Sequence, residues 1–261
     1  MRIAIVGCGY VGKELARRRV EEGDEVYGVT RSGVDIEGVE SLERDVSESY
    51  ELPDADRVFY LVGSDSRDEE GYREAYVEGV RNTLEATDDE TPLVYSSSTG
   101  VYDATDGSWV DEETDLRTDE ATGRRKILIE AEREVLGADR GTTVVRFAGL
   151  YGEGRFWADK YLGDSEVKSG YTNLLRREDA ATALFAAHEG PDDVYLAVDD
   201  EPVHRHDLAR WIADRTGRDH GELVDEPSRT NKRCSNDRLR STGWEPEYPT
   251  YREGLQSLLE Q

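Results

Sequence analysis

Three glycines near the start of the chain have the spacing of a phosphate-binding turn. Gly7, Gly9 and Gly12 form the pattern G-x-G-x-x-G, directly after a short apolar run and at the start of a helical stretch. Tyr10 and Val11 fill the two positions before the last glycine. The first glycine permits a tight turn, the second lets a pyrophosphate approach the backbone, and the third allows close helix packing. With the free amides of a helix N-terminus, this arrangement predicts dinucleotide binding, and a purely structural turn is the alternative.

The end of the second apolar run, at residues 25–29, indicates which dinucleotide would bind. A site that prefers NAD has an acidic residue there, about twenty residues after the glycines, to bind the ribose 2′-hydroxyl. This chain has Thr30, Arg31 and Ser32 instead, with no carboxylate to oppose the guanidinium. A guanidinium beside two hydroxyls suits a 2′-phosphate, so we expect NADP to be preferred, with NAD as the other candidate and a solvated surface arginine as the alternative. Asp45 would either contact the adenine or lie in a solvated loop.

These residues follow short apolar runs that predict strands. Such runs recur along the chain at residues 3–6, 25–29, 57–62, 93–95, 143–147 and 194–198. Helical patterns occur at residues 11–20, 71–86, 121–136, 179–188 and 207–216. Buried strands that alternate with helices are typical of a parallel sheet covered on both faces. We therefore expect an α/β fold of the Rossmann type, a doubly wound parallel sheet with a small C-terminal substrate region.

The alternation of strand and helix patterns becomes less regular after residue 150, which indicates two regions with different functions. Residues 1–150 would form an NAD(P)-binding domain. Residues 151–261 would be a mixed segment that completes the sheet at about 173–200 and forms a small substrate-binding region. The aromatic residues just after the boundary are Phe156, Trp157 and Tyr161. They would form either a stacking surface for a substrate or a small core of their own.

The charge of the chain narrows the choice of partners. There are 59 acidic and 33 basic residues, which gives a formal net charge of −26, and only five of the basic residues are lysines. Such a charge repels polyphosphates and destabilises a compact fold unless salt screens it. We therefore expect a small-molecule substrate and neither nucleic acid nor membrane as a partner. The even spread of acidic residues favours a halophilic protein, with a local acidic patch for a basic partner as the alternative.

Apolar segments and cysteines indicate the compartment. No apolar run approaches the eighteen or so residues of a membrane span, and the N-terminal run is too short for a signal peptide. Cys8 and Cys234 are far apart and lack the spacing of metal ligands, so they predict neither a disulfide framework nor a metal site. We expect a cytoplasmic protein.

Several segments together resemble the extended branch of the short-chain dehydrogenase/reductase superfamily, the NAD(P)-dependent epimerase/dehydratase family. They are the glycine motif at 7–12, the serine-rich strand end at 95–102, and the segments 145–154 and 177–181, while 231–236 and 248–254 resemble a subgroup of small, atypical members. The resemblance covers nearly the whole chain. It implies an oxidoreductase or epimerase that acts on a hydroxyl or carbonyl carbon, for example of a sugar nucleotide. It also implies a homodimer that pairs through the helices at 71–86 and 121–136.

In that family a Tyr-x-x-x-Lys pair and a serine or threonine carry out the chemistry. By resemblance, Ser98 matches the serine that hydrogen-bonds the reacting oxygen, and Lys126 matches the lysine that contacts the nicotinamide ribose. The tyrosine position, four residues before Lys126, holds Thr122. An aliphatic hydroxyl is a poor proton donor, because it cannot be tuned as a phenol beside an ammonium can. Thr122 would at most orient a water or the substrate, and Lys126 would remain as a ribose clamp.

The proton donor is therefore unassigned. The tyrosines that could replace it are Tyr102, Tyr151, Tyr161 and Tyr171. For the first two we expect a packing role. Two functions follow from the sequence: an NADP-preferring oxidoreductase or epimerase-like protein, and a catalytically impaired NAD(P)-binding sensor or scaffold. Both would bind the cofactor, so turnover is what separates them.

Overall fold

The computed structural model describes residues 1–66, 68–155 and 157–259, so Phe156 lies outside the described residues. Its centre is a seven-stranded sheet with the strand order β12-β7-β5-β4-β1-β2-β3. All neighbouring strands in this sheet are parallel. The bounds of these strands are β1 Arg2–Val6, β2 Glu25–Thr30, β3 Val39–Glu43, β4 Arg57–Tyr60, β5 Leu93–Ser98, β7 Thr142–Phe147 and β12 Val194–Ala197.

The chain winds outward from β1 in both directions. It first forms β2 and β3 on one side, and then returns to form β4, β5, β7 and β12 on the other. Six of these strands coincide with the predicted apolar runs, and the Rossmann-type α/β fold is confirmed. Because the strand order reverses between β1 and β4, a crevice is expected at the carboxyl ends of these two strands.

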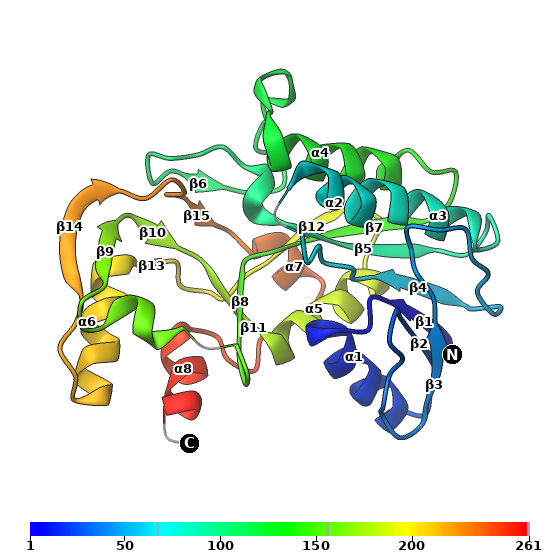
Figure 1. The fold of residues 1–261 in the computed structure, drawn as a ribbon, viewed down its shortest axis with the longest axis horizontal. Helices are drawn as coiled ribbons and strands as arrows, with labels where there is room; N and C mark the ends of the chain where they lie inside the picture. Colours follow the sequence, from blue (N-terminus) through cyan, green and yellow to red (C-terminus); the bar gives the residue numbers. More distant parts are fainter. Residues whose placement is uncertain (67, 156, 260–261) are drawn as a thin grey trace.

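Helices cover both faces of the sheet (Figure 1). On one face lie α1 (Tyr10–Glu21) and α5 (Arg177–Glu189), and on the other lie α4 (Gly123–Leu136) and the helical run that follows β4. Successive side chains of a strand point to opposite faces. Ile3 and Ile5 accordingly belong to a different buried cluster from Ala4 and Val6. The two buried faces hold the carboxyl ends of the strands in fixed positions.

The helical run after β4 differs from the single α-helix predicted at 71–86. It consists of α2 (Glu69–Arg73), a π-helical segment η1 (Glu74–Glu78) and α3 (Gly79–Glu85). The buried Tyr60 hydroxyl at the end of β4 donates a hydrogen bond to the carbonyl of Ala75 within the π-helical segment. A Cβ atom on Gly79 would overlap that hydroxyl, so the glycine makes room for it. The wider helical turn is thus tied to the sheet beneath it.

The C-terminal region lies beside one end of the sheet (Figure 1). It consists of short paired strands and three helices. The strands are β6 Trp109–Val110, β8 Gly149–Tyr151, β9 Glu166–Ser169, β10 Tyr171–Thr172, β11 Leu174–Arg176, β13 Val203–His204, β14 Glu222–Pro227 and β15 Arg233–Cys234. One of the strands, β6, comes from earlier in the chain and pairs with β15. The helices are α6 Arg205–Thr216, α7 Asp237–Ser241 and α8 Tyr251–Leu259, and one short 3-10 turn of this region is η4 Ala158–Tyr161. Two further 3-10 turns come from earlier in the chain, η2 Thr99–Val101 directly after β5 and η3 Thr118–Glu120 before α4.

This region has a small core of its own. Tyr151 of β8, Leu208 and Ile212 of α6, and Tyr251 and Leu255 of α8 are buried together. Among the described residues, none of the helices is both long enough and apolar enough to cross a lipid bilayer.

The melting temperature of the protein is expected to rise with ionic strength, because a net charge of −26 makes the folded chain repel itself. Molar salt shortens the screening length to about 3 Å. Exposed ion pairs such as Arg81–Glu134 weaken in salt, but each contributes at most about 1 kcal/mol. We expect a rise of about 5–10 °C, which corresponds to a gain of a few kcal/mol. Thermal melts from dilute buffer to molar KCl measure it, and a flat or falling melting temperature would favour the local acidic patch.

Candidate active site

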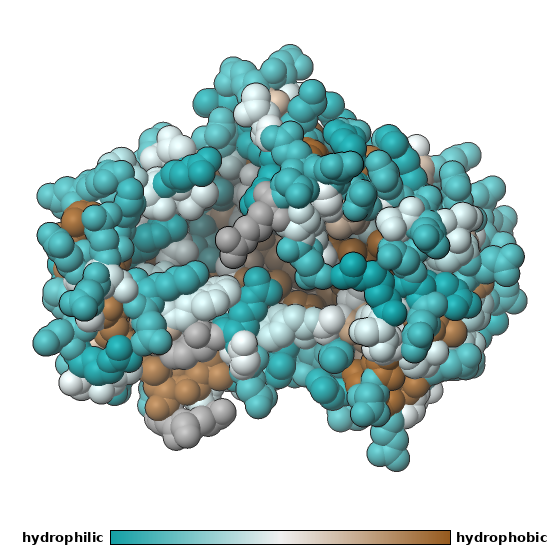
Figure 2. Space-filling model, viewed as in Figure 1, coloured by the Kyte–Doolittle hydropathy of each residue, from teal (hydrophilic) through white to brown (hydrophobic). Residues whose placement is uncertain are grey.

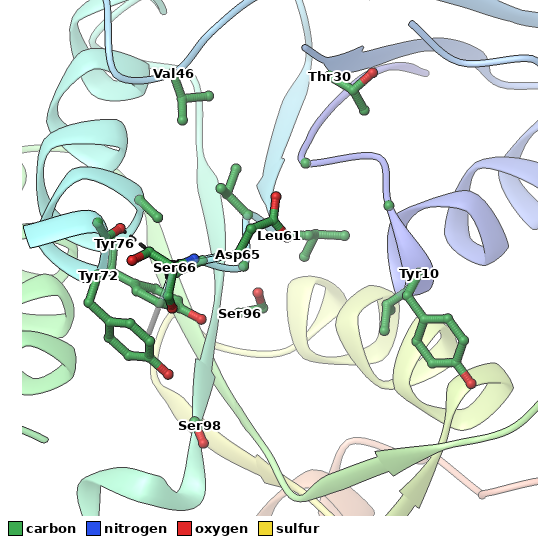
Figure 3. Close-up of a pocket in the computed structure, with 18 of the residues that line it drawn as sticks. Tyr10, Thr30, Val46, Leu61, Asp65, Ser66, Tyr72, Tyr76, Ser96 and Ser98 are labelled. Atoms are coloured by element: carbon green, nitrogen blue, oxygen red, sulfur yellow. Dashed lines mark hydrogen bonds between the residues drawn. The ribbon is translucent and has the colours of Figure 1, made fainter. Parts of the chain in front are cut away.

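A cavity of about 960 Å³ runs along the carboxyl ends of the central strands. Its walls come from the carboxyl ends of β2, β5 and β7 and from the segments that follow β1, β2, β3, β4 and β7. Figure 2 shows the hollow in the middle of this face. In the close-up of Figure 3, Thr30 lies at one end of the cavity and Ser98 at the other. The cavity therefore crosses the point at which the strand order reverses.

The glycine motif forms the turn between β1 and α1 at the middle of this cavity. Gly7 has φ +84°, and a Cβ atom there would lie 2.5 Å from Val62 N, so a larger residue cannot fit. A Cβ atom on Gly12 would lie 2.8 Å from Gly7 O, which shows how closely the helix packs on the turn. Gly7, Gly9, Tyr10 and Val11 line the cavity, and Gly12 supports them. In the part of the chain that the structure describes, no side chain caps the start of α1, so its first amides are available to a phosphate group.

Thr30, Arg31, Ser32 and Asp45 line the end of the cavity next to β2 and β3. The Asp45 carboxylate accepts hydrogen bonds from the amide and hydroxyl of a nearby serine, and these bonds lower its pKa. The statement that no carboxylate opposes Arg31 is wrong. Arg31 Nη2 lies 2.6 Å from Asp65 Oδ2, which comes from the loop after β4. This partner is 34 residues away in the sequence, and the local pattern around Arg31 gives no sign of it.

Three serines at the end of β5 line the opposite end, Ser96, Ser97 and Ser98. The Ser97 hydroxyl donates to Glu132 Oε1 at 2.6 Å within a buried cluster, so it serves the fold. Ser98 Oγ accepts a hydrogen bond of 3.0 Å from the amide of Gly100. This bond orients the Ser98 hydroxyl and leaves its proton available for an oxygen in the cavity, which is the role that the resemblance implies.

Thr122 and Lys126 occupy a different position. Thr122 is the residue before α4, and both side chains are exposed. Neither belongs to the wall of the cavity as far as the structure describes the chain. The structure thus brings Ser98 together with the glycine turn and Arg31, and leaves the Thr-x-x-x-Lys pair outside. The catalytic roles of Thr122 and Lys126 stay predictions.

The four tyrosines that the sequence offers as replacements also lie outside the cavity wall, among the described residues. Tyr102 and Tyr151 are 4% and 2% exposed, and burial raises the pKa of each phenol. Tyr161 packs against the small C-terminal core. The ring of Tyr171 contacts that of His204 edge-on, with centroids 5.6 Å apart. All four are held by packing, as expected for the first two.

The cavity contains tyrosines that the sequence analysis missed. Tyr72 of α2 and Tyr76 of the π-helical segment both line it, and their ring centroids lie 4.9 Å apart. Figure 3 shows the Tyr72 hydroxyl directed toward the Ser98 end, with Tyr10 on the opposite side. The four-residue spacing of Tyr72 and Tyr76 on a predicted helix was the one available signal. It did not say which face of the helix meets the cavity.

Arg155 and Trp157 complete the rim. The Arg155 guanidinium lies 5.3 Å from the centroid of the Trp157 ring and 5.4 Å from that of Tyr10. Trp157 is 37% exposed and lines the cavity, whereas Tyr161 belongs to the core. Among the described residues, no cluster of His, Cys, Asp or Glu side chains could hold a metal ion.

The fold and this cavity define a Rossmann-type protein with the features of a dinucleotide site. Residues 1–162 match the family described as the RmlD substrate binding domain. The chain belongs to this family, and its resemblance to the extended short-chain dehydrogenase/reductase superfamily is confirmed. A search of curated proteins gave no match.

Solved structures agree with this assignment. A protein from Methylobacillus flagellatus, assigned as an NAD-dependent epimerase/dehydratase, is 32% identical; the match covers 99% of this chain and 97% of that one, with a TM-score of 0.78. A protein of unknown function from Silicibacter pomeroyi DSS is 27% identical, with coverage of 99% and 98% and a TM-score of 0.80. MoeE5 in complex with UDP-glucuronic acid and NAD is 18% identical, with coverage of 99% and 97% and a TM-score of 0.81, and shares the fold.

Proposed function

We propose that this chain is an NAD(P)-dependent oxidoreductase or epimerase that acts on a hydroxyl or carbonyl carbon of a sugar nucleotide. The observation that carries the proposal is the continuous cavity between the glycine turn and Ser98. A dinucleotide held at the glycines, with its adenosine toward Thr30, would extend its other half toward Ser98. MoeE5, which shares the fold, holds UDP-glucuronic acid and NAD together.

The residues of the cavity have distinct tasks in this proposal. The amides at the start of α1 bind the pyrophosphate, and Arg31 binds a 2′-phosphate. A bound nicotinamide would supply or accept a hydride. Ser98 donates a hydrogen bond to the reacting oxygen and stabilises the negative charge that develops there. Trp157 and Arg155 offer an aromatic and a cationic surface to the substrate at the rim.

The finer parts of the proposal concern the preferred cofactor, the cellular environment and the oligomeric state. Arg31 supports NADP as the preferred cofactor, although it must exchange Asp65 for the phosphate. The charge of −26 supports a protein of a halophile's cytoplasm. A homodimer through the helices at 71–86 and 121–136 remains part of the proposal. Two ion pairs, Arg73–Glu130 and Arg81–Glu134, already join these helices within one chain.

Turnover tests the proposed function. The protein is incubated with NADP⁺ or NAD⁺ and with UDP-glucose or UDP-glucuronic acid in molar KCl, and reduced cofactor and sugar products are quantified. We expect hydride transfer, and we expect Ser98→Ala to lower its rate by about 10²–10³ with little change in cofactor affinity. Ser108→Ala, in a loop outside the cavity wall, is the matched control. A rate that survives Ser98→Ala would contradict the role of this hydroxyl.

A second candidate function is a dinucleotide-binding sensor or scaffold without turnover. The observation that favours it is the exposed position of Thr122 and Lys126, outside the cavity wall that the described residues form. Cofactor binding without hydride transfer to or from either sugar nucleotide would support this candidate over the enzyme.

A further inference from the structure

The cavity has a phenol at its Ser98 end. Tyr72 is half-buried and lines the cavity from α2, and Figure 3 shows its hydroxyl directed toward the end at which Ser98 lies. The other tyrosines of the wall are placed differently. Tyr10 Oη is buried against Gly152, on the other side of the cavity. Tyr76 comes from the next turn, its ring is tilted 45° against that of Tyr72, and burial raises the pKa of its phenol.

Tyr72 stands beside the start of α4, where the superfamily's tyrosine would be expected from the sequence. The Arg124 guanidinium, two residues after Thr122, lies 4.9 Å from the centroid of the Tyr72 ring. A Cβ atom on Gly123 would lie 3.6 Å from the carboxylate of Glu69 in α2. The first turn of α4 and the first turn of α2 are therefore neighbours.

The same turn of α4 is joined to the serine end of β5. Arg125 Nε donates a hydrogen bond of 3.0 Å to the carbonyl of Val101. Val101 ends the 3-10 turn η2, which begins directly after Ser98. The phenol of Tyr72, the start of α4 and the Ser98 hydroxyl thus gather at one end of the cavity.

The backbone that carries Tyr72 has an unusual form. The π-helical segment η1 begins two residues after Tyr72. Such segments are rare and occur frequently at functional sites. The ion pair between Arg73 and Glu130, at 2.6 Å, fixes this part of the helix against α4. The position of the phenol is therefore set by the sheet below and by α4 beside it.

We propose that Tyr72 supplies the phenol of this site, next to the nicotinamide, and exchanges the proton with the reacting oxygen of the substrate. This role rests on the proposed function. In the reducing direction the Tyr72 hydroxyl donates its proton to a carbonyl oxygen while the carbonyl carbon receives the hydride of the reduced cofactor. The C=O group becomes CH–OH, and the phenolate regains a proton from water. Arg124 stabilises the negative charge that the phenol carries between these events.

The first test uses the full chain loaded with NADP⁺ and given UDP-glucose or UDP-glucuronic acid. We expect Tyr72→Phe to slow hydride transfer by about 10²–10⁴, with the dissociation constant of the dinucleotide unchanged within about threefold. Tyr151→Phe is the matched control, because its hydroxyl is buried outside the cavity wall without a hydrogen-bond partner among the described residues. Turnover that survives Tyr72→Phe, or that is lost in Tyr151→Phe instead, overturns the inference and leaves the proposed function standing.

The second test needs no turnover. With 3-nitrotyrosine in place of Tyr72, the absorbance of the ionised nitrophenol reports its titration midpoint. A positively charged nicotinamide beside it is expected to lower the midpoint by about one pH unit in NADP⁺ relative to NADPH. The same probe in place of Tyr248, outside the cavity wall, is expected to give equal midpoints.

The two tests separate the two hypotheses. Equal midpoints at position 72 in the two redox states overturn the inference, even where turnover is observed. A difference in midpoint without hydride transfer for either sugar nucleotide supports the position of Tyr72 beside the nicotinamide and overturns the proposed function. If Tyr72→Phe melts at a lower temperature, its loss of turnover could come from unfolding. The nitrophenol titration is made on the folded protein, so it still shows whether residue 72 lies beside the nicotinamide.

Discussion

Replacing Glu132 with alanine is expected to lower the free energy of unfolding by about 3–5 kcal/mol, because it leaves a buried guanidinium without its counter-charge. Glu132 and Arg146 are 2% and 4% exposed. Two hydrogen bonds join them, Nε to Oε1 at 2.9 Å and Nη2 to Oε2 at 2.7 Å. Burial alone would lower the pKa of Arg146, but the bonds and charge of Glu132 outweigh it and raise the pKa. Urea unfolding followed by circular dichroism measures the loss.

The matched control is Glu134→Ala, two residues further along α4. Glu134 pairs with Arg81 at the surface, where their side chains are 31% and 48% exposed. Water and salt screen such a pair, so we expect a loss of at most about 1 kcal/mol. Equal losses of unfolding free energy in the two variants would contradict the larger stabilisation that we expect from the buried pair. Because Ser97 also donates to Glu132, the buried variant is expected to disturb the neighbouring Ser98 as well.

The second large effect concerns the choice between NADPH and NADH. Arg31→Ala is expected to weaken NADPH binding by about ten- to a hundredfold, the equivalent of the 1.5–3 kcal/mol typical of hydrogen bonds to charged groups. NADH lacks the 2′-phosphate, so its affinity should hardly change. Asp65→Asn is expected to strengthen NADPH binding, since it removes a negative charge that competes for the same guanidinium. Isothermal titration calorimetry gives all the dissociation constants.

The exposure of the Arg31–Asp65 pair would allow a 2′-phosphate to displace the carboxylate. The two side chains are 67% and 85% exposed, so their pairing contributes at most about 1 kcal/mol. Asp35→Asn is the control for net charge, because Asp35 is exposed in the loop that carries Arg31 but lies outside the cavity wall. Equal affinities for NADPH and NADH in both the natural protein and Asp65→Asn would refute the role of Arg31.

Most of the fold could be predicted because it depends on local patterns. Short apolar runs marked six of the seven central strands, and 3.6-residue periodicity marked the helices between them. The seventh strand, the exposed edge strand β3, did not stand out because its sequence VESLE contains few apolar residues. The π-helical segment was missed because it depends on Tyr60, a residue of another element. No periodicity within residues 71–86 reports that contact.

The residues of the candidate site could be predicted only where a single segment of the sequence determines their position. The glycine turn, Thr30 to Ser32 and Ser98 each lie at the end of a predicted strand, and all of them line the cavity. Asp65 and Tyr72 come from the loop and helix after β4, and their neighbours are distant in sequence. Such pairings arise from how the helix packs on the sheet. A sequence motif such as Thr122 to Lys126 contains no information on how the helix after β4 packs on the sheet.

The π-helical segment also determines which side chains of this helical run face the cavity. Such a segment has the form of an α-helix that has gained one residue, and one residue turns an α-helix by about 100°. An insertion there rotates the part that carries Tyr72 relative to the part that packs Val80 into the core. Relatives one residue shorter between α2 and α3 would present a different side chain to the cavity.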